Sequence, residues 1–146
     1  MGLFSTCKLN TDLGNTYSKR EVDAKFYDVN NKSMTVGKGI DQNNWSAGTL
    51  YFEKMGRTVY VSGELKLKNA AINGKEYNVC NPSVIGGDFL PFSGMHGLIG
   101  LVIGSGSKIC YVKYITEQKT LRLLNQSGSD IAAGSYVQIT GSYICY

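Results

Sequence analysis

The sequence predicts an all-β fold, an antiparallel β-sandwich or Greek-key barrel head that follows a short N-terminal helix. The chain has 146 residues, which is enough for one domain with a short appendage. It contains 18 glycines, 10 tyrosines and only 2 prolines, a composition typical of strands joined by glycine-rich turns. Seven to nine short apolar segments alternate with turn residues, which favours a sandwich or a Greek-key barrel.

The first element is a helix over residues 18–27. Ser18 and Glu21 have the spacing of a capping box, in which each side chain accepts a hydrogen bond from the other residue's backbone N–H. Tyr17 and Val22 have the spacing of a hydrophobic staple around the same cap. So short a helix needs packing against a neighbour, which three copies around an axis would supply.

Residues 28–46 are polar and rich in asparagine and glycine, which indicates a linker with at most one short strand at 34–36. We therefore divide the chain into a neck and linker over 1–46 and a β-rich head over 47–146. Trp45 marks the entry to the head, and we interpret it as a core or seam residue. The alternative role for this ring is a platform on which a sugar stacks.

The clearest hairpin joins strands at 49–53 and 58–68 through a turn at 54–57. The second strand alternates between apolar and polar residues, which predicts one buried and one solvent-exposed face. Gly63 lies in line with the apolar positions and predicts a bulge or the close approach of another backbone. The apolar residues predicted to face the core are Val59, Val61, Leu65 and Leu67.

A second hairpin joins strands at 98–103 and 109–115 through a turn at 104–107. Its first strand is apolar at every position except Gly100, whereas a strand with one wet face should alternate. We therefore expect both of its faces to be covered. The sequence predicts no helix long enough to cover the second face of this strand, so a partner subunit is the natural candidate for that cover.

The remaining strands are short. We expect strands at 77–80, 120–124 and 136–146, with a turn at 116–119 and a glycine- and serine-rich loop at 126–134.

Charge and cysteine content exclude several classes of function. The net charge is +4, and lysine and arginine are spread along the chain, so we expect no nucleic-acid partner. No apolar run is long enough for a membrane helix, and the start lacks the features of a signal peptide. The four cysteines form no CxxC pair, which predicts free thiols, no metal site and synthesis in a reducing cytoplasm. They are Cys7, Cys80, Cys110 and Cys145.

No catalytic motif is present, so we expect a binding protein without a cofactor and not an enzyme. His96 is the single histidine and has no nucleophile elbow near it. Aromatic rings stack on sugars while charged side chains reach the hydroxyl groups, which selects six candidate saccharide-binding residues. Packing or plain surface exposure is the competing interpretation for each of them. The candidates are Asp88, His96, Tyr111, Tyr114, Arg122 and Asp130.

The segment TYSKREVDAKF at 16–26 resembles the YSK-x-EVDAK segment that precedes the trimeric tip of bacteriophage tail-fibre and baseplate proteins. The order of later features is similar to the receptor-binding heads of phages that infect Gram-positive bacteria. These features are Trp45, Gly48-x-Leu50, the turn at Gly56, Val59-x-Val61-x-Gly63, Leu90-Pro91 and the ending Gly128 to Tyr136.

This resemblance implies a homotrimer at a virion tail tip or baseplate that contacts other tail proteins. It also implies binding to a host cell-surface saccharide or cell-wall polymer during adsorption. Two alternatives stay open: a structural tail or baseplate component that binds no glycan, and a cell-wall polymer hydrolase. The candidate trimer-interface residues are Tyr17, Val22, Phe26, Leu98, Ile99, Leu101 and Ile103.

Overall fold

The computed structural model describes residues 18–21, 31–92, 98–103 and 108–145, and the chain divides into two units, 1–31 and 32–146. In the first unit, the Ser18 N–H donates to Glu21 Oε1 at 3.0 Å, and the Glu21 N–H donates to Ser18 Oγ at 3.2 Å. The predicted capping box is therefore confirmed, with helical residues at 19–21. The rest of the predicted helix, with Tyr17, Val22 and Phe26, lies outside the described residues.

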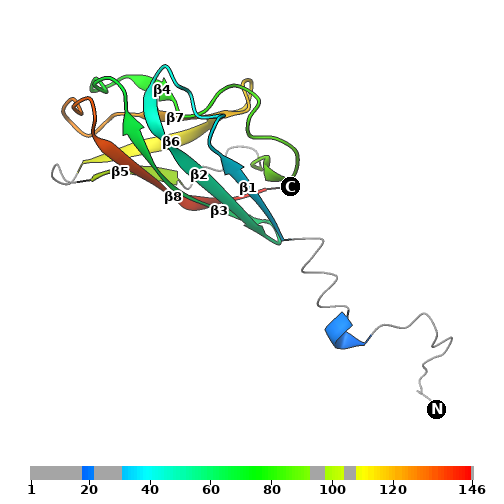
Figure 1. Cartoon of the computed structure of the whole chain (residues 1–146). Coiled ribbons are helices and arrows are strands. Elements are labelled where there is room, and N and C mark those ends of the chain that lie inside the picture. Colours follow the sequence, from blue (N-terminus) through cyan, green and yellow to red (C-terminus); the bar gives the residue numbers. More distant parts are fainter. Residues whose placement is uncertain (1–17, 22–30, 93–97, 104–107, 146) are drawn as a thin grey trace, which may run out of the picture. The chain divides into compact units, whose positions relative to one another are not determined.

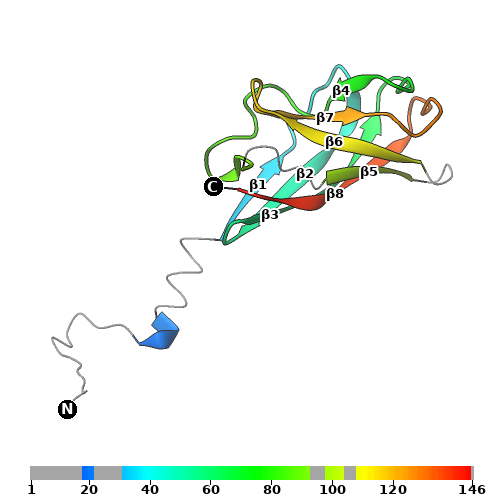
Figure 2. The ribbon, with the colours of Figure 1, turned by 180° about the vertical axis from the view of Figure 1, so that it is seen from behind.

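The second unit is one curled antiparallel sheet of eight strands, which confirms the all-β class (Figure 1). The strand order across the sheet is β1-β2-β3-β8-β5-β6-β7-β4. Figure 2 shows β7, β6, β5 and β8 from behind. A sandwich or Greek-key arrangement stays a prediction. The strands are β1 Lys32–Val36, β2 Trp45–Met55, β3 Thr58–Leu67, β4 Glu76–Asn78, β5 Leu98–Ile103, β6 Ile109–Ile115, β7 Thr120–Leu124 and β8 Tyr136–Ile144, with a short 3-10 helix, η2, at Gly87–Phe89.

The two edges of the curled sheet meet just beyond β1 and β4. Ile40 and Cys80 form an isolated antiparallel bridge there. The Asp41 N–H donates to the Val79 carbonyl at 3.1 Å, and the Asn81 N–H donates to the Gly39 carbonyl at 2.8 Å. These contacts pair backbone groups at edges that would otherwise be left open.

Trp45 is a core residue, as the sequence indicated. Only 1% of its surface is exposed, and its indole N–H donates to the Asn78 carbonyl at 2.8 Å. A buried ring of this kind cannot serve as a sugar platform. The sheet already includes β1, which begins at Lys32 within the segment assigned to the linker from the sequence.

The β2–β3 hairpin confirms the predicted alternation, because Val59, Val61, Leu65 and Leu67 are all buried. The turn is shorter than expected, at 56–57, since both strands extend toward it. Gly63 has φ +153°, and a Cβ at this position would lie 2.2 Å from the Thr49 carbonyl oxygen. The predicted close approach of another backbone is therefore confirmed.

Strand β5 has the predicted bounds, but the described residues cover only one of its faces. Leu98 and Val102 point into the core and are each 5% exposed. Ile99 and Ile103 point outward and are 37% and 46% exposed, because an antiparallel strand between β8 and β6 must alternate its side chains. Among the described residues, no element lies over this outer face, so its cover by a partner subunit stays a prediction.

Candidate binding surface on the outer face of the sheet

Six neighbouring side chains form an apolar surface on the outside of β8, β5 and β6, which we call the outer apolar patch. Sheet register places Ile103 opposite Tyr136, Leu101 opposite Ile109, and Ile99 opposite Tyr111. Tyr111 is 62% exposed and Ile109 is 53% exposed. An exposed, contiguous apolar surface makes this face a candidate site of interaction. Its members are Ile99, Leu101, Ile103, Ile109, Tyr111 and Tyr136.

One edge of this patch is hollowed beside the Tyr111 ring. The hollow has a volume of about 530 Å³, and its outward-facing lining consists of Ile99, Tyr111, Lys113, Leu124 and Gln126. An exposed aromatic face flanked by an amine and an amide is a combination that can bind a sugar, since the ring can pack on C–H groups while the polar groups reach hydroxyls. We call this feature the Tyr111 hollow.

A charged network borders the Tyr111 hollow on β6, β7 and β4. The Lys113 Nζ donates to Glu76 Oε2 at 2.5 Å, and Arg122 Nη1 lies 3.3 Å from Glu76 Oε1. The hydrogen bond from Lys113 is the main reason that the pKa of Glu76 is lowered, and Arg122 lowers this pKa further. The network holds two cations against one carboxylate, so this border of the hollow is positive.

Arg122, a predicted saccharide-binding residue, is held by groups of its own chain. Its Nε donates to Asn78 Oδ1 at 2.8 Å, and its Nη2 donates to Gln118 Oε1 at 3.0 Å. With the Nη1 contact to Glu76, all three guanidinium nitrogens have acceptors. Arg122 therefore fixes β7 to β4 and positions Glu76, which in turn positions Lys113.

The two candidate carboxylates make separate local contacts. Asp88, in η2, forms an ion pair with Lys32 at 2.9 Å, and this contact lowers the pKa of Asp88. Asp130 Oδ1 accepts a hydrogen bond from the Asn73 N–H at 2.9 Å, across two loops. Neither residue lines the Tyr111 hollow.

Tyr114 and His96 complete the candidate list. Tyr114 points inward on β6 and packs partly buried against the core, and burial raises the pKa of its hydroxyl. His96 lies outside the described residues. Of the six candidates, the structure therefore brings two together, Tyr111 and Arg122. Arg122 lies near the Tyr111 hollow because it pairs in register with Lys113, which lines the hollow.

Sequence reasoning missed Lys113 and Gln126 in the hollow, and Ile109 and Tyr136 in the patch. The signal for Ile109 was its place two residues before Tyr111, which puts both on one face of a strand. No comparable signal pointed to Gln126, which follows the end of β7 and reaches the hollow through the path of its loop.

Comparisons with known proteins give no assignment: no protein-family description matches this sequence, and no curated protein matches it significantly. Within the described residues, no cluster of three or more His, Cys, Asp or Glu side chains is arranged to hold a metal ion. The same residues contain no helix with the length and apolarity needed to cross a membrane.

Proposed function

We propose that this chain is the receptor-binding head of a bacteriophage tail fibre or baseplate and binds a host cell-surface saccharide as a homotrimer. The observation that carries the proposal is the Tyr111 hollow, an exposed ring beside Lys113 and Gln126 at the edge of an uncovered apolar patch. The sequence resemblance to phage tail proteins supplies the biological setting.

Each part of the hollow has a role in this binding. The Tyr111 ring packs against the apolar face of a sugar ring, and Gln126 exchanges hydrogen bonds with hydroxyl groups. Lys113 keeps its ammonium beside Glu76 and favours an acidic polymer, because Arg122 leaves the local charge positive. Three heads on one fibre would multiply a weak affinity through their effective concentration.

Binding of the purified chain to Gram-positive cell-wall polysaccharides tests this function. Tyr111→Ala should weaken binding by roughly tenfold or more, which corresponds to about 1.4 kcal/mol. Phe92→Ala is the matched control, since Phe92 is an exposed aromatic residue that does not line the hollow. Equal binding by the two variants would exclude the hollow, and binding of the unmodified chain to no wall polymer or glycan would exclude the function.

The same patch supports a second candidate, a structural tail or baseplate component that binds no glycan. Its exposed isoleucines are suited to protein contacts alone. A trimeric chain that adsorbs to no wall polymer would favour this candidate.

A further inference from the structure

A second apolar surface lies on the outside of the β2–β3 hairpin. Tyr51 and Tyr60 are 50% and 51% exposed, and Met55, at the end of β2, is 55% exposed. Tyr51 pairs with Ser62 and Tyr60 pairs with Glu53, so the two rings are diagonal neighbours on adjacent strands. We call this surface the Tyr51–Tyr60 patch.

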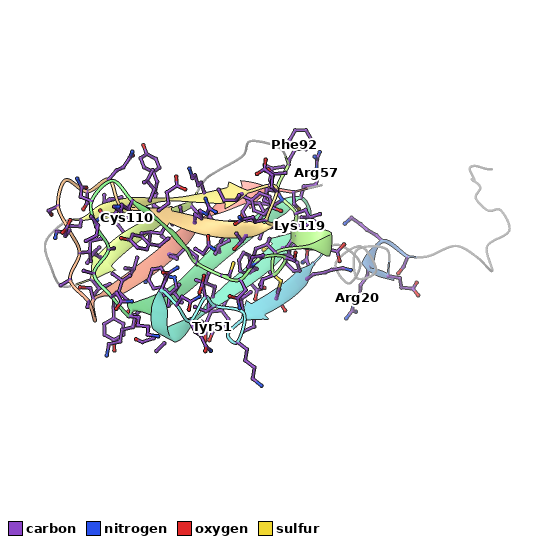
Figure 3. The ribbon with its side chains drawn as sticks, turned by 90° about the horizontal axis from the view of Figure 1, so that it is seen from above. Arg20, Tyr51, Arg57, Phe92, Cys110 and Lys119 are labelled. Carbon is purple, nitrogen blue, oxygen red and sulfur yellow. The ribbon has the colours of Figure 1, made fainter. Side chains whose placement is uncertain are left out.

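A polar strip separates the Tyr51–Tyr60 patch from the outer apolar patch. It runs along β3 and β8 and contains Ser62, Gln138, Thr140 and Ser142, all on the outward face. In Figure 3, Tyr51 lies at one side of the head and the yellow strand β6 at the other. The chain therefore presents two distinct apolar surfaces that face different directions.

The two surfaces have borders of opposite charge. The Lys66 ammonium lies 5.5 Å from the centre of the Tyr136 ring, and Lys108 precedes Ile109 and donates to the Asp130 carbonyl at 2.8 Å. The outer apolar patch is therefore bordered by cations.

The Tyr51–Tyr60 patch is bordered by carboxylates instead. Glu53 lies directly opposite Tyr60, and Glu64, on the outward face of β3, is a diagonal neighbour of Tyr51 on β2 and also of Tyr136 on β8. Both side chains are exposed, and within the described residues neither has an ion-pair partner. Cations predominate around the outer apolar patch and carboxylates around the Tyr51–Tyr60 patch, which favours contact between the two different patches over contact between two copies of one patch.

We infer that the outer apolar patch of one copy packs against the Tyr51–Tyr60 patch of the next copy, so that copies join head to tail and three close into a ring. The inference rests on the homotrimer of the proposed function. A threefold ring cannot use a self-complementary patch, because each copy must offer two different surfaces to its two neighbours. This chain offers two such surfaces, both apolar at the centre and opposite in charge at the border.

This arrangement leaves a place for the saccharide. Ile103 and Tyr136 lie on β5 and β8, away from β7, and Ile109 lies at the start of β6 beyond the part that pairs with β7, whereas the Tyr111 hollow opens toward β7. The seam covers the first group, and the hollow stays at its margin.

Two double variants of the full chain test the seam. Ile103→Gln with Ile109→Gln removes apolar contacts from one patch, and Tyr51→Gln with Tyr60→Gln removes them from the other. Each variant alone should fall from three times 15.9 kDa to 15.9 kDa by size-exclusion chromatography with light scattering. An equal mixture should form dimers of 31.8 kDa, twice 15.9 kDa, because each variant keeps the patch that the other has lost.

Several outcomes would contradict the seam. A Tyr51→Gln/Tyr60→Gln chain that assembles like the unmodified chain would indicate a different interface, as would a mixture that gives only monomers. Circular dichroism must show that both variants are folded, and Ile103→Gln and Tyr60→Gln singly serve as milder variants if a double variant unfolds. Wall binding by the unmodified chain is measured separately, so a failed seam and a failed receptor function are distinguishable.

Discussion

Strands β3 and β5 lie on either side of β8 and alternate in the same way, yet their outer faces differ in chemistry. Both strands point apolar residues into the core, but the outward residues of β3 include Ser62 and Glu64, whereas those of β5 are Ile99, Leu101 and Ile103. Folding of the single chain needs only the inner face of each strand. We propose that the apolar outer face of β5 serves a contact beyond this chain, so inner and outer substitutions should behave differently.

The largest difference is expected between a core leucine and a patch isoleucine. Leu123→Ala should lower the free energy of unfolding by about 2–5 kcal/mol, because Leu123 is fully buried. Ile103→Ala should change it by less than about 0.5 kcal/mol in the monomer, since this side chain is 46% exposed. Denaturant unfolding at low chain concentration measures both, and an equally large loss for Ile103→Ala would show that the outer face is needed for folding.

The close backbone packing at Gly63 in the hairpin should be nearly as sensitive to substitution as the core at Leu123. Gly63→Ala should destabilise the chain by about 2–3 kcal/mol, because the new Cβ would meet the Thr49 carbonyl and the positive φ is strained. Gly86→Ala is the matched control, since its Cβ would enter open space at φ −155°. Thermal unfolding of the two variants compares them, and equal midpoints would be inconsistent with this packing.

Two tyrosines, one facing the core and one facing outward, should differ in how much their hydroxyl groups stabilise the fold. The buried Tyr143 hydroxyl donates to the Phe89 carbonyl at 2.7 Å, and burial raises the pKa of Tyr143 well above its usual range. Tyr143→Phe should cost about 1–3 kcal/mol of unfolding free energy by leaving that carbonyl without its donor. Tyr111→Phe should cost less than about 0.5 kcal/mol, and a reversed order in denaturant unfolding would contradict this assignment.

The smallest effect is expected from the charged network on the outer face. Since the pKa of Glu76 is lowered in the folded chain, its ion pairs stabilise the fold above its ordinary pKa of 4.5. That stabilisation is lost as the pH falls through the lowered value. Glu76→Gln should therefore reduce stability by less than about 1 kcal/mol at pH 7 and by nothing once the carboxylate is protonated. A difference in unfolding free energy between Glu76→Gln and the parent chain that persists after the carboxylate is protonated would contradict this link between its pKa and stability.

Local patterns predicted most of the fold. The capping box at Ser18 and the bounds of β5, β6 and β7 follow from residues close together in the sequence. The curl of the sheet does not, because the bridge between Ile40 and Cys80 joins positions forty residues apart and depends on packing across the whole core.

The binding surface was less predictable, because an apolar residue in a strand carries no mark of which side it faces. The apolar run from Leu98 to Ile103 indicated that both faces of this strand should be covered, but it did not identify the neighbours of each side chain. Only the strand register places Ile99 beside Tyr111. Arg122 illustrates the converse: its charge suggested ligand binding, and its acceptors turned out to be Asn78, Glu76 and Gln118 of the same chain.

The most direct test of the central claim, that the outer face of β5 and β6 is covered in an assembly, is the solution mass of the unmodified chain. Size-exclusion chromatography with light scattering should give a mass near three times 15.9 kDa. A mass of 15.9 kDa at every concentration would contradict the claim, because the exposed isoleucines would then have no partner copy to bury them.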